Sequence, residues 1–133
     1  MGDKYKHLEF IQSVVARMAQ NTFYIRGWSI TVVGAFLTFY DKNKTPHFVG
    51  YFFAVILLTF WISSGYFLKQ ERLFRKLYDE VRIIAESNIN FSLDTSSIKK
   101  KKLDIFCAML SFPQVIFFVP LIFVAIMTVF LLK

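Results

Sequence analysis

The 133-residue chain has one cysteine, three prolines and five glycines, and each scarcity excludes a class of site. Because Cys107 has no second cysteine to pair with, an internal disulfide and a cysteine-based zinc cluster are excluded. The glycines are scattered, so no glycine-rich phosphate loop is present. The first 22 residues lack the apolar core of a secretory signal, and we expect no signal peptide.

Charged residues are scarce in three long apolar runs. The chain is 56% hydrophobic, has 17 phenylalanines and carries a formal charge of +7. Its mean hydropathy is +0.49, and most of the charge falls outside the apolar runs. This combination is typical of a small integral membrane protein with a basic cytoplasmic side. A nucleic-acid-binding domain could carry the same charge but would not need three such runs.

The second apolar run is the clearest membrane segment. Residues 48–68 contain no charged side chain, and as a helix these 21 positions extend about 30 Å, the thickness of a hydrocarbon core. At Lys69 the sequence becomes charged without a proline or glycine to end the helix. We therefore predict one long helix, with span 2 at 48–68 and a cytoplasmic extension at 69–86.

The chain before the first apolar run has the pattern of a helix that packs against another helix. Its apolar positions recur every three or four residues at Leu8, Ile11, Val15, Met18, Thr22 and Ile25. We predict a cytoplasmic helix at 4–21 that pairs with the extension of span 2, where the corresponding positions are Phe74, Leu77, Val81 and Ile84. The alternative is an amphipathic helix that lies on the membrane surface.

Span 1 is predicted at 22–40 and includes one charge, Arg26. This arginine either extends to the inner headgroups as an anchor or points into an aqueous pore. Small side chains form a stripe at Thr31, Gly34, Ala35 and Thr38, which is typical of close helix packing in membranes.

The remaining sequence predicts a loop at 87–97, an interfacial helix at 98–110 and span 3 at 113–132. Residues 103–132 would form a helix of about 45 Å, too long for the bilayer core, and Pro113 offers a break. Thirteen Lys and Arg residues lie in the N-terminal and 69–104 segments, against three elsewhere. This bias places the N-terminus in the cytoplasm and the C-terminus outside the inner membrane.

The expected fold is therefore all-α: a single integral membrane domain, 1–133, with three transmembrane helices and a cytoplasmic antiparallel helical stalk. Span 1 and span 2 form a hairpin, so the helices that continue from them on the cytoplasmic side are adjacent and antiparallel. Three spans with small-residue stripes bury little surface within one copy, and we expect a homo-oligomer.

Two sequence blocks resemble those of a family of small bacterial integral membrane proteins, most of them functionally uncharacterised. The blocks are FIQSVVARMAQNTFYIRGW at 10–28 and GYFLKQERLFRKLYDEVR at 65–82, and NFSLDTSS at 90–97 also matches. The resemblance implies no catalytic or ligand residue. The architecture, a few helices with a small cytoplasmic part, is also similar to that of membrane effectors in nucleotide-signalled anti-phage systems.

Two sets of candidate site residues follow. The first is a basic set that would bind lipid headgroups or an anionic nucleotide or oligonucleotide signal: Arg72, Arg75, Arg82, Lys99, Lys100, Lys101 and Lys102. The second is a polar set that would line a pore if spans gather around an axis: Arg26, Thr31, Thr38, Thr59, Ser63, Ser64 and Gln114. The alternative for the hydroxyls is bonding to their own helix backbone.

The sequence contains no set of residues that would form an active site, and we expect neither enzymatic activity nor a cofactor or metal. The leading functional hypothesis is an oligomeric inner-membrane effector, pore- or channel-forming and gated through its basic cytoplasmic helices, with a role in anti-phage defence. The first alternative is a non-conducting membrane adaptor whose stalk docks a cytoplasmic partner protein. A small transporter subunit is the third hypothesis, disfavoured by the lack of buried charge and of repeats.

Overall fold

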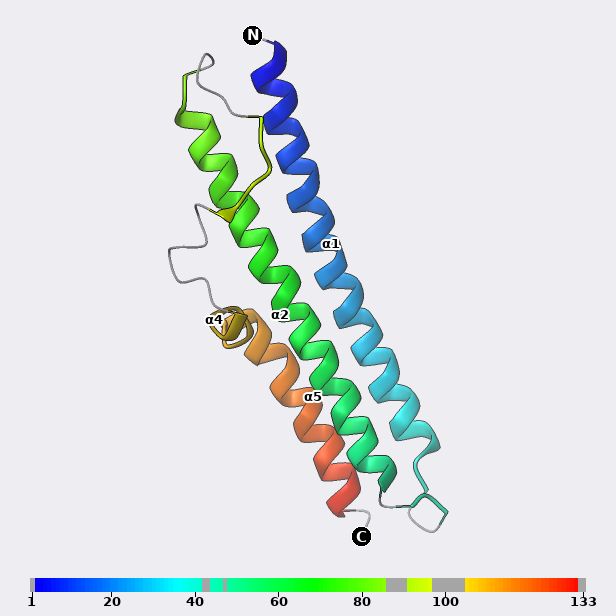
Figure 1. Cartoon of the computed structure of the whole chain (residues 1–133). Helices are drawn as coiled ribbons and strands as arrows, with labels where there is room; N and C mark the ends of the chain where they lie inside the picture. The colour runs from blue at the N-terminus through cyan, green and yellow to red at the C-terminus, as the bar shows by residue number, and fades with distance from the viewer. Residues whose placement is uncertain (1, 42–43, 47, 86–90, 97–104, 132–133) are drawn as a thin grey trace.

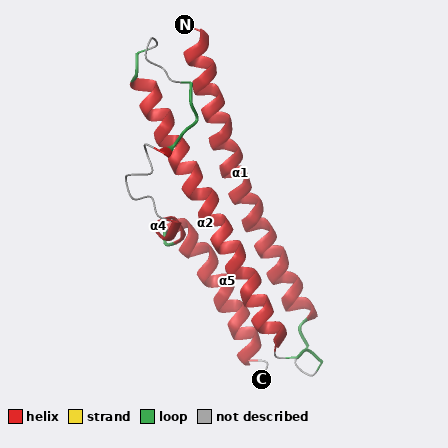
Figure 2. Cartoon of the chain, in the orientation of Figure 1, coloured by secondary structure: helices red, strands yellow, loops and turns green. Residues whose placement is uncertain are grey.

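The fold is all-helical in the residues that the structure describes, which are 2–41, 44–46, 48–85, 91–96 and 105–131 (Figure 2). The structure is a computed structural model. Its helices are α1 (Gly2–Phe39), α2 (Phe48–Ile83), α4 (Ile105–Met109) and α5 (Phe112–Leu131). The predicted all-α class is confirmed.

The two longest helices, α1 and α2, form an antiparallel hairpin and lie side by side along their whole length (Figure 1). With 38 residues, α1 extends about 57 Å. At the connection, the Thr45 amide donates to the Asp41 carbonyl at 2.7 Å. At the far end, Lys4 Nζ donates to the carbonyls of Arg82 and Ile84 at 3.2 and 2.6 Å. A cation there satisfies carbonyls at the C-terminal end of α2 and interacts favourably with the negative end of the helix dipole.

Each long helix passes unbroken from an apolar segment into a charged one. We call residues 22–39 with 48–68 the apolar half of the hairpin, and 2–21 with 69–83 the charged half. The helix α2 continues past Lys69 and ends at Ile83, three residues before the expected end at 86. The helix α1 continues without interruption from the predicted range 4–21 into the predicted range 22–40, and it ends at Phe39, one residue before the expected end.

The charged half is held together by a small aliphatic cluster. Its buried members are Ile11, Leu73, Leu77 and Val81, with Leu8, Phe74 and Tyr78 packed around them. The expected register was one position off in α2, where Leu73 is fully buried and Phe74 was expected. In α1, Val14 is buried and Val15 is partly buried. A straight helix drifts about 20° per heptad against a seven-residue repeat, so a seam extrapolated by spacing alone loses register. Ile84, at the end of that series, is 40% exposed.

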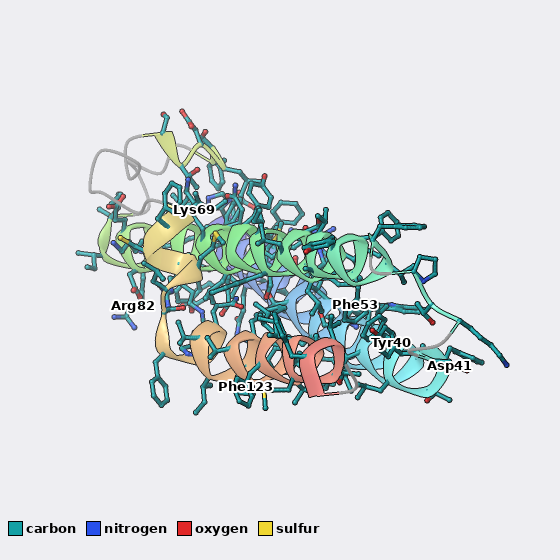
Figure 3. All side chains as sticks on the ribbon, turned by 90° about the horizontal axis from the view of Figure 1, so that it is seen from below. Tyr40, Asp41, Phe53, Lys69, Arg82 and Phe123 are labelled. Carbon is teal, nitrogen blue, oxygen red and sulfur yellow. The ribbon has the colours of Figure 1, made fainter. Side chains whose placement is uncertain are left out.

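The apolar half has a second cluster, to which α5 contributes. Val33 of α1, Phe53 and Leu57 of α2 and Ala125 of α5 are buried together. The rings of Phe36 and Phe53 stack with centroids 4.0 Å apart. Figure 3 shows Phe53 between the helices, whereas Phe123 projects outward from α5.

The C-terminal helices pack on α2. The short α4 meets α2 at Gly65, where a Cβ would collide with the side chain of Met109. The Trp61 indole Nε1 donates to the Met109 carbonyl at 3.2 Å. From there α5 runs antiparallel to α2, and its far end reaches Gly50 through Val129. Of the predicted interfacial helix 98–110, residues 98–104 lie outside the described ranges.

Among the described residues, α2 and α5 are long and apolar enough to cross a membrane. Only 22% and 17% of their apolar windows are buried, so most of this surface faces outward and does not form the core of the chain. The helix α1 is not among them, because Arg26 and its threonines lower its hydropathy.

The aliphatic cluster of the charged half generates the first prediction. Ile11→Asp or Leu77→Asp should destabilise the folded protein by at least about 3 kcal/mol, because each buries an unpaired carboxylate. Thermal unfolding in detergent, followed by circular dichroism, measures the loss. Ile83→Asp is the control, since Ile83 is 80% exposed and its replacement should cost no more than about 1 kcal/mol. Equal losses at all three positions would contradict the pairing of these helix segments.

Candidate functional site

Polar side chains gather where the two halves of the hairpin meet the start of α5. We call this group the polar junction; its members are Arg26 of α1, Ser64 and Glu71 of α2, and Gln114 of α5. It lies between the aliphatic cluster of the charged half and the apolar cluster shared with α5. A conformational change in one half must therefore pass this level to reach the other.

Ser64 and Gln114 form the most buried contact of the junction, and both side chains have no exposed surface. The Ser64 hydroxyl donates to Gln114 Oε1 at 3.0 Å, and the Gln114 amide donates to the serine oxygen at 2.9 Å. The sequence placed both residues on a candidate pore wall. Within one chain, the structure places them in the interior, where they join α2 to α5.

Arg26 links α1 to the start of α5. Its Nη2 donates to the Pro113 carbonyl at 3.3 Å, and its guanidinium carbon lies 5.4 Å from the centroid of the Phe117 ring. Its Nε is buried without a hydrogen-bond partner. The guanidinium is thus held at the end of α5 nearer the charged half.

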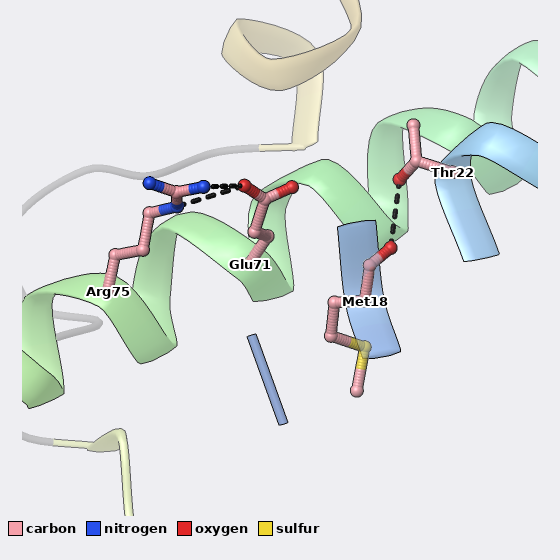
Figure 4. A network of polar contacts seen from close by, with 4 residues as sticks. All are labelled: Met18, Thr22, Glu71 and Arg75. Carbon is pink, nitrogen blue, oxygen red and sulfur yellow. Dashed lines mark hydrogen bonds and ion pairs between the residues drawn. The ribbon is translucent and has the colours of Figure 1, made fainter. Parts of the chain in front are cut away.

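Glu71 supplies the acidic group of the junction (Figure 4). Its Oε1 accepts from Arg75 Nε at 2.9 Å and from Nη2 at 2.7 Å. The Glu71 side chain is only 13% exposed, against 63% for Arg75. Burial disfavours the charge of Arg26, and the Glu71 carboxylate across the hairpin partly offsets this effect. The Glu71 carboxylate therefore interacts electrostatically with two arginines, Arg75 on its own helix and Arg26 on α1.

The basic candidates are only partly placed by the structure. Arg72 is half-buried, while Arg75 and Arg82 are exposed. Steps of three and seven residues put these arginines on one broad face of α2, turned away from the aliphatic cluster. Glu71 neutralises part of this face by pairing with Arg75. Lys99, Lys100, Lys101 and Lys102 lie outside the described residues.

The threonines of the predicted pore wall lie on the outer surface of the single chain. Thr31, Thr38 and Thr59 are exposed, and each hydroxyl donates to the carbonyl four residues earlier in its own helix, at 3.1, 2.8 and 2.9 Å. Ser63 is half-buried.

Two residues of this region were missed as site candidates. Glu71 was not among the candidates, because its position facing Arg26 depends on tertiary packing. Ser29 is fully buried and donates to the Ile25 carbonyl at 2.7 Å. Its seven-residue spacing from Thr22, also buried, was the available sequence signal.

The junction holds charges and hydrogen bonds but not the groups of a metal centre. In the ranges that the structure describes, no three His, Cys, Asp or Glu side chains come together. Cys107 is exposed on α4. The chemistry available at the junction is the exchange of hydrogen-bond and ion-pair partners between helices.

The Ser64–Gln114 contact generates the second prediction. Ser64→Ala should cost about 1–3 kcal/mol, because the buried Gln114 amide loses its partner. Adding Gln114→Leu should recover most of that loss, since no polar group then remains unpaired. Unfolding of the two single variants and the double variant gives the coupling energy. Additive losses, without coupling, would show that the two side chains do not contact each other.

Comparison with known proteins identifies no relative: no family model, no curated protein and no solved structure matches this chain. The family resemblance of the two sequence blocks therefore stays a prediction. The observations that bear on the function of the protein are the geometry of the hairpin and of the polar junction.

Proposed function

We propose that the protein is an oligomeric effector of the bacterial inner membrane, which opens a pore when a signal acts on its basic cytoplasmic helices. One observation carries this proposal: α2 is a single unbroken helix from Phe48 to Ile83, apolar at one end and basic at the other. A rigid helix transmits a tilt or shift along its whole length without unfolding.

The apolar half is proposed to lie in the bilayer with α5. Large apolar side chains are exposed on both, among them Trp28, Phe39, Tyr51 and Phe52 of the apolar half and Phe123 and Phe130 of α5. Surface of this extent is suited to lipid and marks an interaction site in a soluble protein. Residues 22–39 of α1 share the buried cluster of Val33, Phe53 and Ala125, so they enter the membrane with α2 and α5 as span 1. The Lys and Arg bias then makes the charged half a cytoplasmic stalk.

Self-association is proposed through α1. Gly27, Thr31, Gly34 and Thr38 follow one another at steps of four, three and four residues, all exposed. Added Cβ atoms at Gly27 and Gly34 would meet nothing within 4 Å. By helix geometry this face is opposite Ser29 and Val33, which are buried. A face of small and hydroxyl side chains lets a second helix approach closely in a membrane and offers polar groups to a pore.

The polar junction would couple the signal to the pore. The Glu71 carboxylate is attracted by Arg75 on its own helix and by Arg26 on α1. An anionic ligand bound to the basic face of the stalk would compete for Arg75 and leave Glu71 to Arg26. The ligand shifts the equilibrium only if it binds the two arrangements with different affinity.

The proposed signal is an anion such as a nucleotide or an oligonucleotide, and anionic lipid is the other ligand of the basic residues. The similarity of this build to anti-phage membrane effectors favours a role in defence. The alternative function is an adaptor that does not conduct and whose stalk docks a cytoplasmic partner. The exposed basic face would serve either function, and conductance distinguishes them.

Topology is the third prediction. A reporter active only in the cytoplasm, fused after Ile89, should be active. A reporter active only in the periplasm, fused after Lys133, should also be active, because three spans lie between the cytoplasmic N-terminus and the C-terminus. Both sites on the same side of the membrane would require an even number of spans and would contradict the proposed fold.

Conductance is the fourth prediction. The purified protein in liposomes should conduct ions, and nucleotides or oligonucleotides should change that conductance. Arg75→Gln with Arg82→Gln should leave insertion intact and reduce the response. The matched control is Arg17→Gln, which removes an exposed arginine from α1.

The outcomes separate pore from sensor. If the unmodified protein does not conduct with any nucleotide or oligonucleotide, the effector function is wrong and the adaptor is favoured. If it conducts but responds equally with and without the two arginines, the pore stands and the proposed sensor does not.

A further inference from the structure

Four tyrosines of the hairpin lie near the two ends of its apolar half. We call Tyr24 with Tyr66 the inner pair, next to the charged half, and Tyr40 with Tyr51 the outer pair, next to the connection between the helices. Along α1 the inner and outer tyrosines are sixteen residues apart, and along α2 they are fifteen residues apart. Tyr40 directly follows α1, and its amide donates to the Phe36 carbonyl at 2.9 Å, so the helical turn includes it. At a rise of about 1.5 Å per residue, the two pairs are about 23–24 Å apart.

The register of the hairpin makes each pair level. The rings of Phe36 and Phe53 stack with centroids 4.0 Å apart, and this contact fixes the heights of α1 and α2 against each other. Counted from it along the two antiparallel helices (Figure 1), the inner tyrosines differ in height by about 1.5 Å and the outer tyrosines by about 3 Å. Both long helices therefore place tyrosines at the same two heights.

The helix α5, which packs on the apolar half, has exposed aromatic rings at the same heights. Phe112, at its start, directly precedes the residue whose carbonyl accepts from Arg26, and Arg26 is two residues from the inner pair. Phe130, near its other end, follows Val129, which packs at Gly50, one residue from the outer pair. The two phenylalanines are eighteen residues apart, about 27 Å along the helix. Aromatic rings thus surround the molecule at two levels.

Between the two levels the outward surface is mainly aliphatic. In residues 29–38 of α1 and 53–65 of α2, every exposed large apolar side chain is aliphatic: Ile30, Leu37, Val55, Leu58 and Ile62. Trp61 lies in this stretch but is half-buried and donates to the Met109 carbonyl, and on α5 only Phe123 interrupts the aliphatic surface. Rings at headgroup level and aliphatic side chains between them are the arrangement that a bilayer favours.

The polar ends of the inner pair lie toward the charged half. The Tyr24 hydroxyl accepts from Gln20 Nε2 at 2.9 Å, and Gln20 belongs to the charged half. On α2, Lys69 follows Tyr66 by three residues and begins the charged segment. A tyrosine with its ring against acyl chains and its hydroxyl among polar groups is suited to the membrane–water interface. The inner pair therefore marks the boundary between hydrocarbon and headgroups.

We infer that the protein fits a hydrocarbon layer of about 23–27 Å, thinner than the ordinary core of about 30 Å, and that its preferred lipid partner is a phospholipid with short acyl chains. The inference rests on the proposed insertion of the apolar half and α5 in the membrane. Tilting the helices would reduce the vertical distance between the levels further, so it cannot remove the mismatch. A short span thins the lipid around it or gathers with other copies, so the mismatch also favours the proposed oligomer.

The test is thermal unfolding of the full-length protein in liposomes of dimyristoleoyl, dioleoyl or dierucoyl phosphatidylcholine, whose hydrocarbon cores increase in thickness in that order. The melting temperature should be highest in the dimyristoleoyl bilayer, because the mismatch grows with thickness. We expect it to fall by about 2–8 °C at each step to a thicker bilayer.

A pair of variants tests whether the tyrosines set this preference. Tyr24→Leu with Tyr66→Leu removes the inner pair and extends the apolar stretch toward Lys69, so the highest melting temperature should move to the dioleoyl bilayer. The matched control is Tyr5→Leu, which removes an exposed tyrosine from the charged half and should leave the order of the three lipids unchanged. If the double variant fails to fold, the order of the lipids for the unmodified protein still decides the inference.

Two results would overturn the inference and leave the proposed function standing, provided that the topology reporters show insertion. One is a melting temperature of the unmodified protein that is highest in a thicker bilayer or equal in all three. The other is a folded double variant with the same lipid order as the unmodified protein, since the tyrosines then do not set the depth. If the reporters show no insertion, the proposed function fails and the inference fails with it.

Discussion

The pairing of α1 with α2 along their full length is the interaction on which the rest of the structure depends. In the charged half, the seam between the two helices is a narrow aliphatic cluster around Ile11 and Leu77. In the apolar half, α5 joins the seam through Ala125. In the part of the chain that the structure describes, α4 and α5 pack on the apolar half, and the charged half has little other buried apolar surface to stabilise it. The charged segments of α1 and α2 must therefore move together or separate from each other.

The polar junction lies where the seam changes from the aliphatic cluster of the charged half to the cluster that α5 shares. At this level α5 begins, and the hydrogen bonds between Ser64 and Gln114 fix its position against α2. Arg26 reaches the same helix through the Pro113 carbonyl, and Glu71, on the side of the stalk, partly offsets the cost of burying its charge. Buried polar groups are costly when unpaired, so a change of partner at one of them requires a change at its neighbours. This is the physical basis for coupling in the proposed effector.

Much of the fold was accessible from the sequence because long helices depend on local periodicity. The charge-free run before Lys69 and the lack of a helix breaker after it predicted one helix that continues from an apolar into a charged segment, and α2 has this form. The side-chain register was less accessible: Leu73 is fully buried, one position from Phe74, which the spacing indicated. The contact of Gly65 with Met109 and the approach of Glu71 to Arg26 join distant parts of the chain, and no local pattern encodes them.

The central claim, that α2 is half in lipid and half in water, is tested most directly by cysteine accessibility. Single cysteines at Val55, Ile62, Lys76 and Ile83, all on exposed positions of α2, are placed in a Cys107→Ser background. A membrane-impermeant maleimide applied to inverted inner-membrane vesicles should label residues 76 and 83 and spare 55 and 62. All four should react after detergent is added. Equal labelling of 55 and 83 in intact vesicles would place the whole helix in water, and protection of both would place the stalk against the bilayer.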